Sequence, residues 1–148
     1  MSDSNYITLA EEFFANNPKC SEALEQLKSG VEIKLNFEHK DEAALFYNDG
    51  LELIHRKANN YDVEFIIHLE ALRQLHAKKN LNISEVGIEF LKQVLLGHAE
   101  IKIHGNILNI LSNGYIKIIK LAGPDFLNFL SEHGLGSLQK IIQFIRNR

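Results

Sequence analysis

The residues of this chain best suited to chemistry are its seven histidines and its one cysteine. A zinc site needs such ligands at helical i, i+4 spacing or in an HExxH run, and the histidines show neither pattern. Cys20 lies early in an amphipathic helical segment and remote from any histidine, which favours packing over a Cys–His nucleophile. No GxSxG, P-loop or GxGxxG motif is present. We therefore expect no catalytic residue, no metal site and no cofactor.

Several histidines nevertheless lie close to predicted strands, namely His55, His68, His98 and His104. Their spacing is typical of side chains at the surface or at the rim of a core. His68 is the one candidate for an enzyme that acts on an apolar substrate. The alternation of its strand places it opposite Phe65 and Ile67, facing away from them. The sequence therefore predicts a protein that is not an enzyme.

Size and composition indicate one globular domain. The chain has 148 residues, of which 45% are hydrophobic and 24% charged, as in ordinary folded proteins. A single cysteine permits no intrachain disulfide and favours a reducing, intracellular setting. The first residues carry no signal-peptide pattern, the chain does not close on a peroxisomal tripeptide, and no apolar run reaches the roughly 18 residues of a membrane span. We expect a soluble, cytoplasmic protein.

Charge is distributed unevenly along the chain. Residues 101–148 hold six basic and two acidic side chains, which makes that segment +4 and leaves −7 for the rest of a chain of net charge −3. An apolar, mildly basic segment favours transient contact with an anionic membrane surface. Its last basic residues are Lys140, Arg146 and Arg148. The basic residues are few and do not cluster with aromatics, so nucleic-acid binding is disfavoured.

The first half of the chain predicts helices followed by strands. Thr8 and Glu11 form a capping-box pattern for a first helix, and Asn17 with Pro18 predicts the start of a second. Period-two alternation then predicts strands over 31–37, 43–47, 51–56 and 63–69, with Asp49-Gly50 as a tight turn. Because the connections are short, we expect the four strands to be antiparallel neighbours.

The second half predicts mainly helices, over 71–78, from Asn82 or Ser84 to Gly97, from Pro124 to Gly134, and from 136 to 145. A fifth strand over 100–104 and an apolar segment over 107–121 lie between them. The fold class is α+β, with the boundaries 1–30 for N-terminal helices, 31–122 for the core and 123–148 for C-terminal helices.

The apolar segments 107–121 and 126–130 exceed what the short strands need for cover. Such a surplus serves to cover a hydrophobic ligand, to thicken the helical layer, or to pair two subunits.

Three segments in this order resemble the sterol carrier protein 2 (SCP2) sterol-binding domain, in its bacterial form. They are the Asp-Gly-Leu-Glu-Leu of 49–53, the strand running into an acidic helix start over 60–72, and the helix, glycine, Lys-flanked strand and Gly-Asn of 90–106. The resemblance covers roughly 28–120. It implies a five-stranded, largely antiparallel sheet with helices on one face, and an apolar tunnel for sterols, fatty acyl chains or other lipids. The chain departs from the family in a longer insert at 78–83 and in added helices after 121.

Carried over by position, the resemblance implies a lipid-binding lining made of Phe65, Ile67, Leu69, Phe90, Val94, Leu95, Ile103, Ile107 and Leu111. One polar group at the mouth would hold the polar end of a lipid, for which Tyr115, Asn113 and His104 are candidates. The leading hypothesis is non-catalytic binding or transfer of a hydrophobic small molecule, such as a fatty acyl, sterol-like or isoprenoid lipid. The alternative is an interaction module of the same fold with a filled cavity, forming a homodimer through its C-terminal helices at Phe129 and Ile142.

Overall fold

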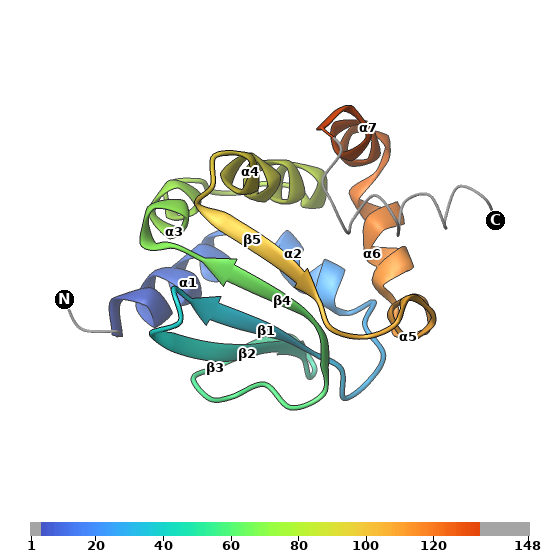
Figure 1. The fold of residues 1–148 in the computed structure, drawn as a ribbon, viewed down its shortest axis with the longest axis horizontal. Coiled ribbons are helices and arrows are strands. Elements are labelled where there is room, and N and C mark those ends of the chain that lie inside the picture. Colours follow the sequence, from blue (N-terminus) through green and yellow to red (C-terminus); the bar gives the residue numbers. More distant parts are fainter. Residues whose placement is uncertain (1–3, 134–148) are drawn as a thin grey trace.

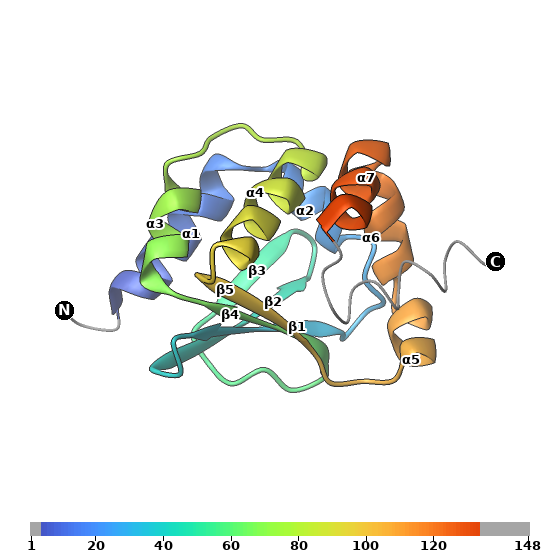
Figure 2. The ribbon, with the colours of Figure 1, turned by 45° about the horizontal axis from the view of Figure 1, so that its top comes forward.

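The computed structural model describes residues 4–133 of the chain. Its elements, drawn in Figure 1, are α1 (Ser4–Asn16), α2 (Lys19–Leu24), β1 (Glu32–Phe37), β2 (Asp41–Tyr47), β3 (Leu51–Ile54), β4 (Tyr61–Ile67), α3 (Leu69–His76), α4 (Ile83–Leu95), β5 (Ala99–Ile103), α5 (Ile107–Ser112), α6 (Tyr115–Ala122) and α7 (Pro124–His133). Figure 2 shows one sheet with the helices gathered over one of its faces and α5 beyond the end of the sheet. The expected α+β class, with a five-stranded sheet covered on one face, is confirmed.

The sheet is mixed, with the strand order β3-β2-β1-β4-β5. The pairs β1–β2, β2–β3 and β4–β5 are antiparallel, but β4 pairs with β1 and runs parallel to it. The expectation that the fourth strand pairs antiparallel with the third is therefore wrong. The connection from β3 runs along the side of the sheet away from the helices and returns at the start of β1 (Figure 2).

Glu32, at the start of β1, fixes this crossing. Its carboxylate accepts two hydrogen bonds from the Arg56 guanidinium at 3.0 and 2.6 Å, and a third from the backbone N–H of Asn59 at 2.8 Å. The backbone N–H of Glu32 in turn donates to the carbonyl of Asn60 at 2.8 Å. One buried carboxylate thus holds the residues before β4 beside β1, which places the two strands in parallel.

Alternation along β4 separates two chemically different faces. Val63, Phe65 and Ile67 point toward the helices, while Glu64 points to the opposite face. There the Glu64 carboxylate accepts hydrogen bonds from Asn36 at 2.8 Å and shares one with His104 at 2.6 Å. The apolar face of the sheet is therefore the one that the helices cover.

Helix ends follow the sequence signals in part. Asn82 and Glu85 form the capping box of α4, and α7 begins at Pro124, as predicted. The first helix starts at Ser4, so Thr8 lies inside it and does not cap it. The buried Asn17 does not cap α2 either. Its amide donates to the carbonyls of Phe13 and Lys78, and its carbonyl oxygen accepts from Leu81, which ties the 78–83 insert to α1.

The helix expected over 136–145 lies outside the described residues, as do Lys140, Ile142, Arg146 and Arg148. Within 4–133 no helix is both long enough and apolar enough to cross a bilayer.

Candidate functional site

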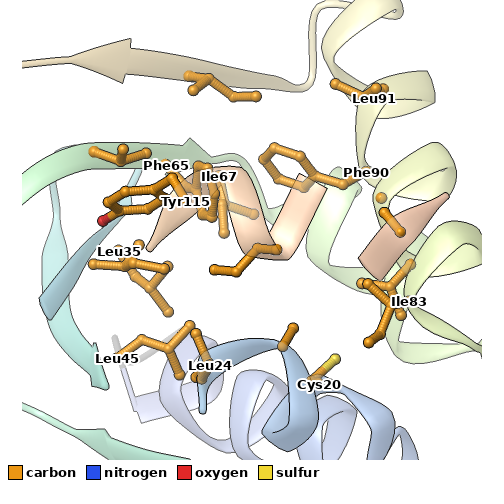
Figure 3. Close-up of a pocket in the computed structure, with 18 of the residues that line it drawn as sticks. Cys20, Leu24, Leu35, Leu45, Phe65, Ile67, Ile83, Phe90, Leu91 and Tyr115 are labelled. Carbon is orange, nitrogen blue, oxygen red and sulfur yellow. The ribbon is translucent and has the colours of Figure 1, made fainter. Parts of the chain in front are cut away.

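A cavity of about 280 Å³ lies between the sheet and the helical layer. Each of the described helices, and each strand except β3, contributes residues to the lining. Figure 3 shows lining side chains from the sheet and from the helices. The lining residues are Ala10, Phe13, Phe14, Cys20, Ala23, Leu24, Ile33, Leu35, Leu45, Val63, Phe65, Ile67, Leu72, Leu75, Ile83, Val86, Gly87, Phe90, Leu91, Ile101, Ile103, Ile110, Tyr115, Ile118, Ile119, Ala122 and Phe126. All are apolar apart from the thiol of Cys20 and the hydroxyl of Tyr115.

The cavity lies where the hydrophobic core divides. Buried residues form three clusters: a main one on the sheet, a second around Phe13, Cys20 and Leu75, and a third around Leu91 and Leu130. Members of all three clusters line the cavity. Most domains have one continuous hydrophobic core. Here the three clusters instead surround a shared space.

Five of the ten residues that the sequence analysis named as lipid-binding candidates line the cavity: Phe65, Ile67, Phe90, Ile103 and Tyr115. Figure 3 labels four of them among the lining side chains.

The others lie elsewhere. Leu69 and Val94 are half-buried and pack against the main core cluster, while Leu95 is 45% exposed at the end of α4. Ile107 and Leu111 have side chains outside the described set.

Sequence reasoning missed the contributions of α2 and of β1. Ala23 and Leu24 come from a short helix whose apolar face was visible, and Ile33 and Leu35 alternate with polar residues in β1. Ile110 was missed as well, although it is fully buried and lines the cavity. Its signal was available, since it lies one helical turn after Ile107 in the same apolar segment.

Only one of the three candidate polar contacts lines the cavity. Tyr115 does, and its hydroxyl has no hydrogen-bond partner among the described residues. Asn113 donates to the Asp62 carboxylate at 2.6 Å, and His104 is held by Glu64. Burial, and to a lesser degree the nearby charge of Asp62, raise the pKa of the Tyr115 hydroxyl well above its ordinary value.

The remaining candidate chemical groups are placed away from the cavity or held inactive. Burial raises the pKa of the Cys20 thiol to about 12, so the thiolate needed for nucleophilic attack is scarce at neutral pH. His68 is exposed at the start of α3, with its imidazole 3.4 Å from the Glu38 carboxylate. Within residues 4–133 no group of three histidine, cysteine or acidic side chains could hold a metal ion.

No family model matches the chain, and neither does any curated protein. Among solved structures it is similar to a chain described as "UbiJ-SCP2 Ubiquinone synthesis protein", at 14% identity and a TM-score of 0.44, over 78% of this chain and 90% of that one. The fold class stands on the sheet order and the single helical layer of this protein itself.

Proposed function

We propose that the protein binds a hydrophobic small molecule or lipid in the cavity and carries it without chemical change. The observation that supports this proposal is the cavity of about 280 Å³ with an almost wholly apolar lining. Small-molecule sites typically measure about 300–1,000 Å³ and are lined mainly by hydrophobic and aromatic side chains. An engineered apolar cavity of about 150 Å³ already binds benzene.

The energy of such a space favours an occupant. The lining leaves apolar side chains uncovered between the sheet and the helices, and covering that apolar surface with hydrocarbon is favourable. Each methylene moved from water into the cavity would contribute about 0.8 kcal/mol. A medium-length aliphatic chain, or one part of a longer lipid, fits these dimensions.

A non-catalytic role is part of the proposal. The described lining contains no carboxylate, imidazole, ammonium or guanidinium group that could act as a general acid or base. Its thiol is held in the protonated form. The groups available to a bound molecule therefore orient it and shield it from water.

Transfer at a membrane surface is supported by the exposed side of α5 and α6. Leu108 and Leu121 are 64% and 47% exposed, and the exposed Lys117 and Lys120 lie on the same stretch of chain. Apolar side chains with neighbouring ammonium groups favour the interface of an anionic bilayer. Tyr115, Ile118 and Ile119 of α6 line the cavity, so the helix that would touch the membrane also borders the ligand.

The alternative of an interaction module requires a filled cavity. Helix α7 lies at the side of the cavity, where Phe126 is a lining residue and Leu130 packs on Leu91. Sedimentation of Phe129→Asp addresses this alternative, which predicts loss of a dimer with no change in lipid uptake.

Native mass spectrometry of the full chain tests the proposed function. We expect a mass adduct that disappears after organic-solvent extraction, and a lipid in the extract. The extracted protein should then bind the neutral fluorophore 1-aminoanthracene in competition with methyl octanoate. A protein that carries no adduct and binds neither probe would overturn the proposal.

A further inference from the structure

Phe126 is the one side chain of α7 that reaches the cavity, among those that the structure describes. Helix α7 packs on α4 and α6, and Figure 2 shows it beside these two helices and away from the sheet. Leu127, Phe129 and Leu130 of the same helix belong to the third buried cluster and do not line the cavity. Phe126 is half-buried, so its ring lies at the outer boundary of the cavity.

Gly87 makes room for that ring inside α4. A Cβ at this position would lie 3.0 and 3.1 Å from two ring carbons of Phe126, so a larger residue would displace the ring by a few tenths of an ångström. Glycine in the interior of a helix is less favourable than alanine. The ring that lies in place of a side chain explains the glycine. Both residues line the cavity, so together they form its wall between α4 and α7.

The surroundings of the Phe126 ring are apolar as well. Leu91 and Leu130 are each 2% exposed and belong to the same cluster as Phe126, and Leu91 also lines the cavity. Removal of the ring would therefore extend the cavity into a space bordered by hydrocarbon. Such a space favours further methylenes of a ligand over water.

We propose that Phe126, packed on Gly87, limits the length of the hydrocarbon that the cavity accepts. This inference rests on the proposed function, because it names a specificity-determining residue for the molecule bound in the same cavity. Once a chain fills the space up to the ring, further methylenes stay outside the lining and add no affinity.

A series of straight-chain methyl esters, from methyl hexanoate to methyl palmitate, tests the limit. Each ester is titrated against 1-aminoanthracene bound to the extracted full-length protein. In the wild type, affinity should rise by up to about fourfold per methylene and then level off within the series. In Phe126→Ala it should level off about two to four methylenes later, so the longest esters should bind at least about tenfold more tightly than they bind the wild type. Methyl hexanoate should gain no affinity.

Phe129→Ala is the matched control, because Phe129 lies on the same helix, is half-buried and lies outside the lining. Its affinities should level off at the wild-type length. Gly87→Ala tests the contact with the ring through Tm. It should raise the Tm of Phe126→Ala, because alanine is the better helix former, and should raise it less, or lower it, while the ring is present.

Four results would overturn the inference while leaving the proposed function standing. The first is the same levelling-off length in wild type and Phe126→Ala, or an equal shift in Phe129→Ala. The second is an equal gain for esters of every length. The third is an affinity that rises up to methyl palmitate without levelling off, which the wild type alone reveals should Phe126→Ala fail to fold. The fourth is an equal effect of Gly87→Ala on Tm with and without the ring.

Binding of none of the esters would overturn the proposed function and this inference with it.

Discussion

Phe65 of β4 and Phe90 of α4 face each other with ring centroids 5.0 Å apart and ring planes inclined at 48°. Both rings line the cavity, so this contact joins the sheet to the helical layer at the edge of the proposed binding space. Aromatic pairs in such geometry contribute about 0.5–1.5 kcal/mol beyond the burial of their area.

A double-mutant cycle with Phe65→Leu and Phe90→Leu should therefore give a coupling energy of about 0.5–1.5 kcal/mol in urea denaturation. A second cycle, pairing Phe90→Leu with Phe37→Leu, is the control. Phe37 stacks on Tyr6 and does not line the cavity, so the two changes should be additive. Additivity in the first cycle would contradict a direct contact between the layers.

Gly114 allows α6 to lie against the segment after α2. Its φ is +102°, and a Cβ there would lie 2.1 Å from the carbonyl oxygen of Gln26. Gly97 also has a positive φ, +82°, but a Cβ there would meet nothing within 4 Å. Gly97→Ala should lower the free energy of unfolding by about 1–2 kcal/mol, because alanine disfavours a positive φ. Gly114→Ala should lower it by at least about 1 kcal/mol more, because its Cβ also clashes with Gln26. Equal losses in urea denaturation would show that α6 does not depend on this close approach.

Tyr115→Phe should stabilise the ligand-free protein. The substitution removes a buried hydroxyl that has no partner among the described residues, so we expect a gain of about 1 kcal/mol. For a chain of this size that gain corresponds to a rise in Tm of about 2–4 °C. Tyr47→Phe should change Tm by much less. A fall in the Tm of Tyr115→Phe after lipid extraction would indicate that the hydroxyl has a partner within the protein itself.

Acid should destabilise the fold through Glu64. Burial of this carboxyl opposes its ionisation, but hydrogen bonds from Asn36 and His104 and the nearby Lys34 ammonium outweigh burial and hold its pKa below the usual value. The folded state therefore binds fewer protons than the unfolded state. The associated stability is complete above the unfolded pKa of about 4.3 and is lost as pH falls through the folded pKa.

The free energy of unfolding, measured in urea between pH 7 and pH 3, should thus fall below about pH 5. The Arg56 guanidinium lowers the pKa of Glu32, and the Tyr6 hydroxyl that of Glu38, so both carboxylates act in the same direction. Glu64→Gln should be less stable at pH 7 and should show a shallower acid dependence. If the free energy of unfolding of Glu64→Gln falls with pH as steeply as that of the wild type, Glu64 does not contribute to the acid sensitivity.

Local sequence patterns predicted what depends on neighbouring residues. The alternation in β4, the Asn82–Glu85 capping box and the Asp49-Gly50 turn each follow from backbone and side-chain geometry within a few residues, and each is present. The left-handed φ values of +57° at Asp49 and +138° at Gly50 are of the kind a tight hairpin turn uses.

Features set by distant contacts were not predictable in this way. The parallel pairing of β4 with β1 depends on Glu32 meeting Arg56 and Asn59 across the chain. The role of Asn17 likewise depends on Lys78 and Leu81, far away in sequence. The cavity itself depends on how three clusters of buried residues pack around it, so the positions carried over from the family resemblance included the exposed Leu95 and passed over the buried Ile110.

The central claim is that the cavity itself binds the hydrophobic molecule, and cavity-filling variants test it most directly. Ala23 of α2 and Val86 of α4 line the cavity from two different helices, whereas Ala15 is exposed on α1. The measurement is the affinity of 1-aminoanthracene for the extracted wild type and for Ala23→Phe, Val86→Phe and Ala15→Phe, with Tm recorded for each. We predict tight binding by the wild type and Ala15→Phe, and at least about tenfold weaker binding by both cavity-filling variants at an undiminished Tm. Wild-type affinity in folded Ala23→Phe and Val86→Phe would contradict the account.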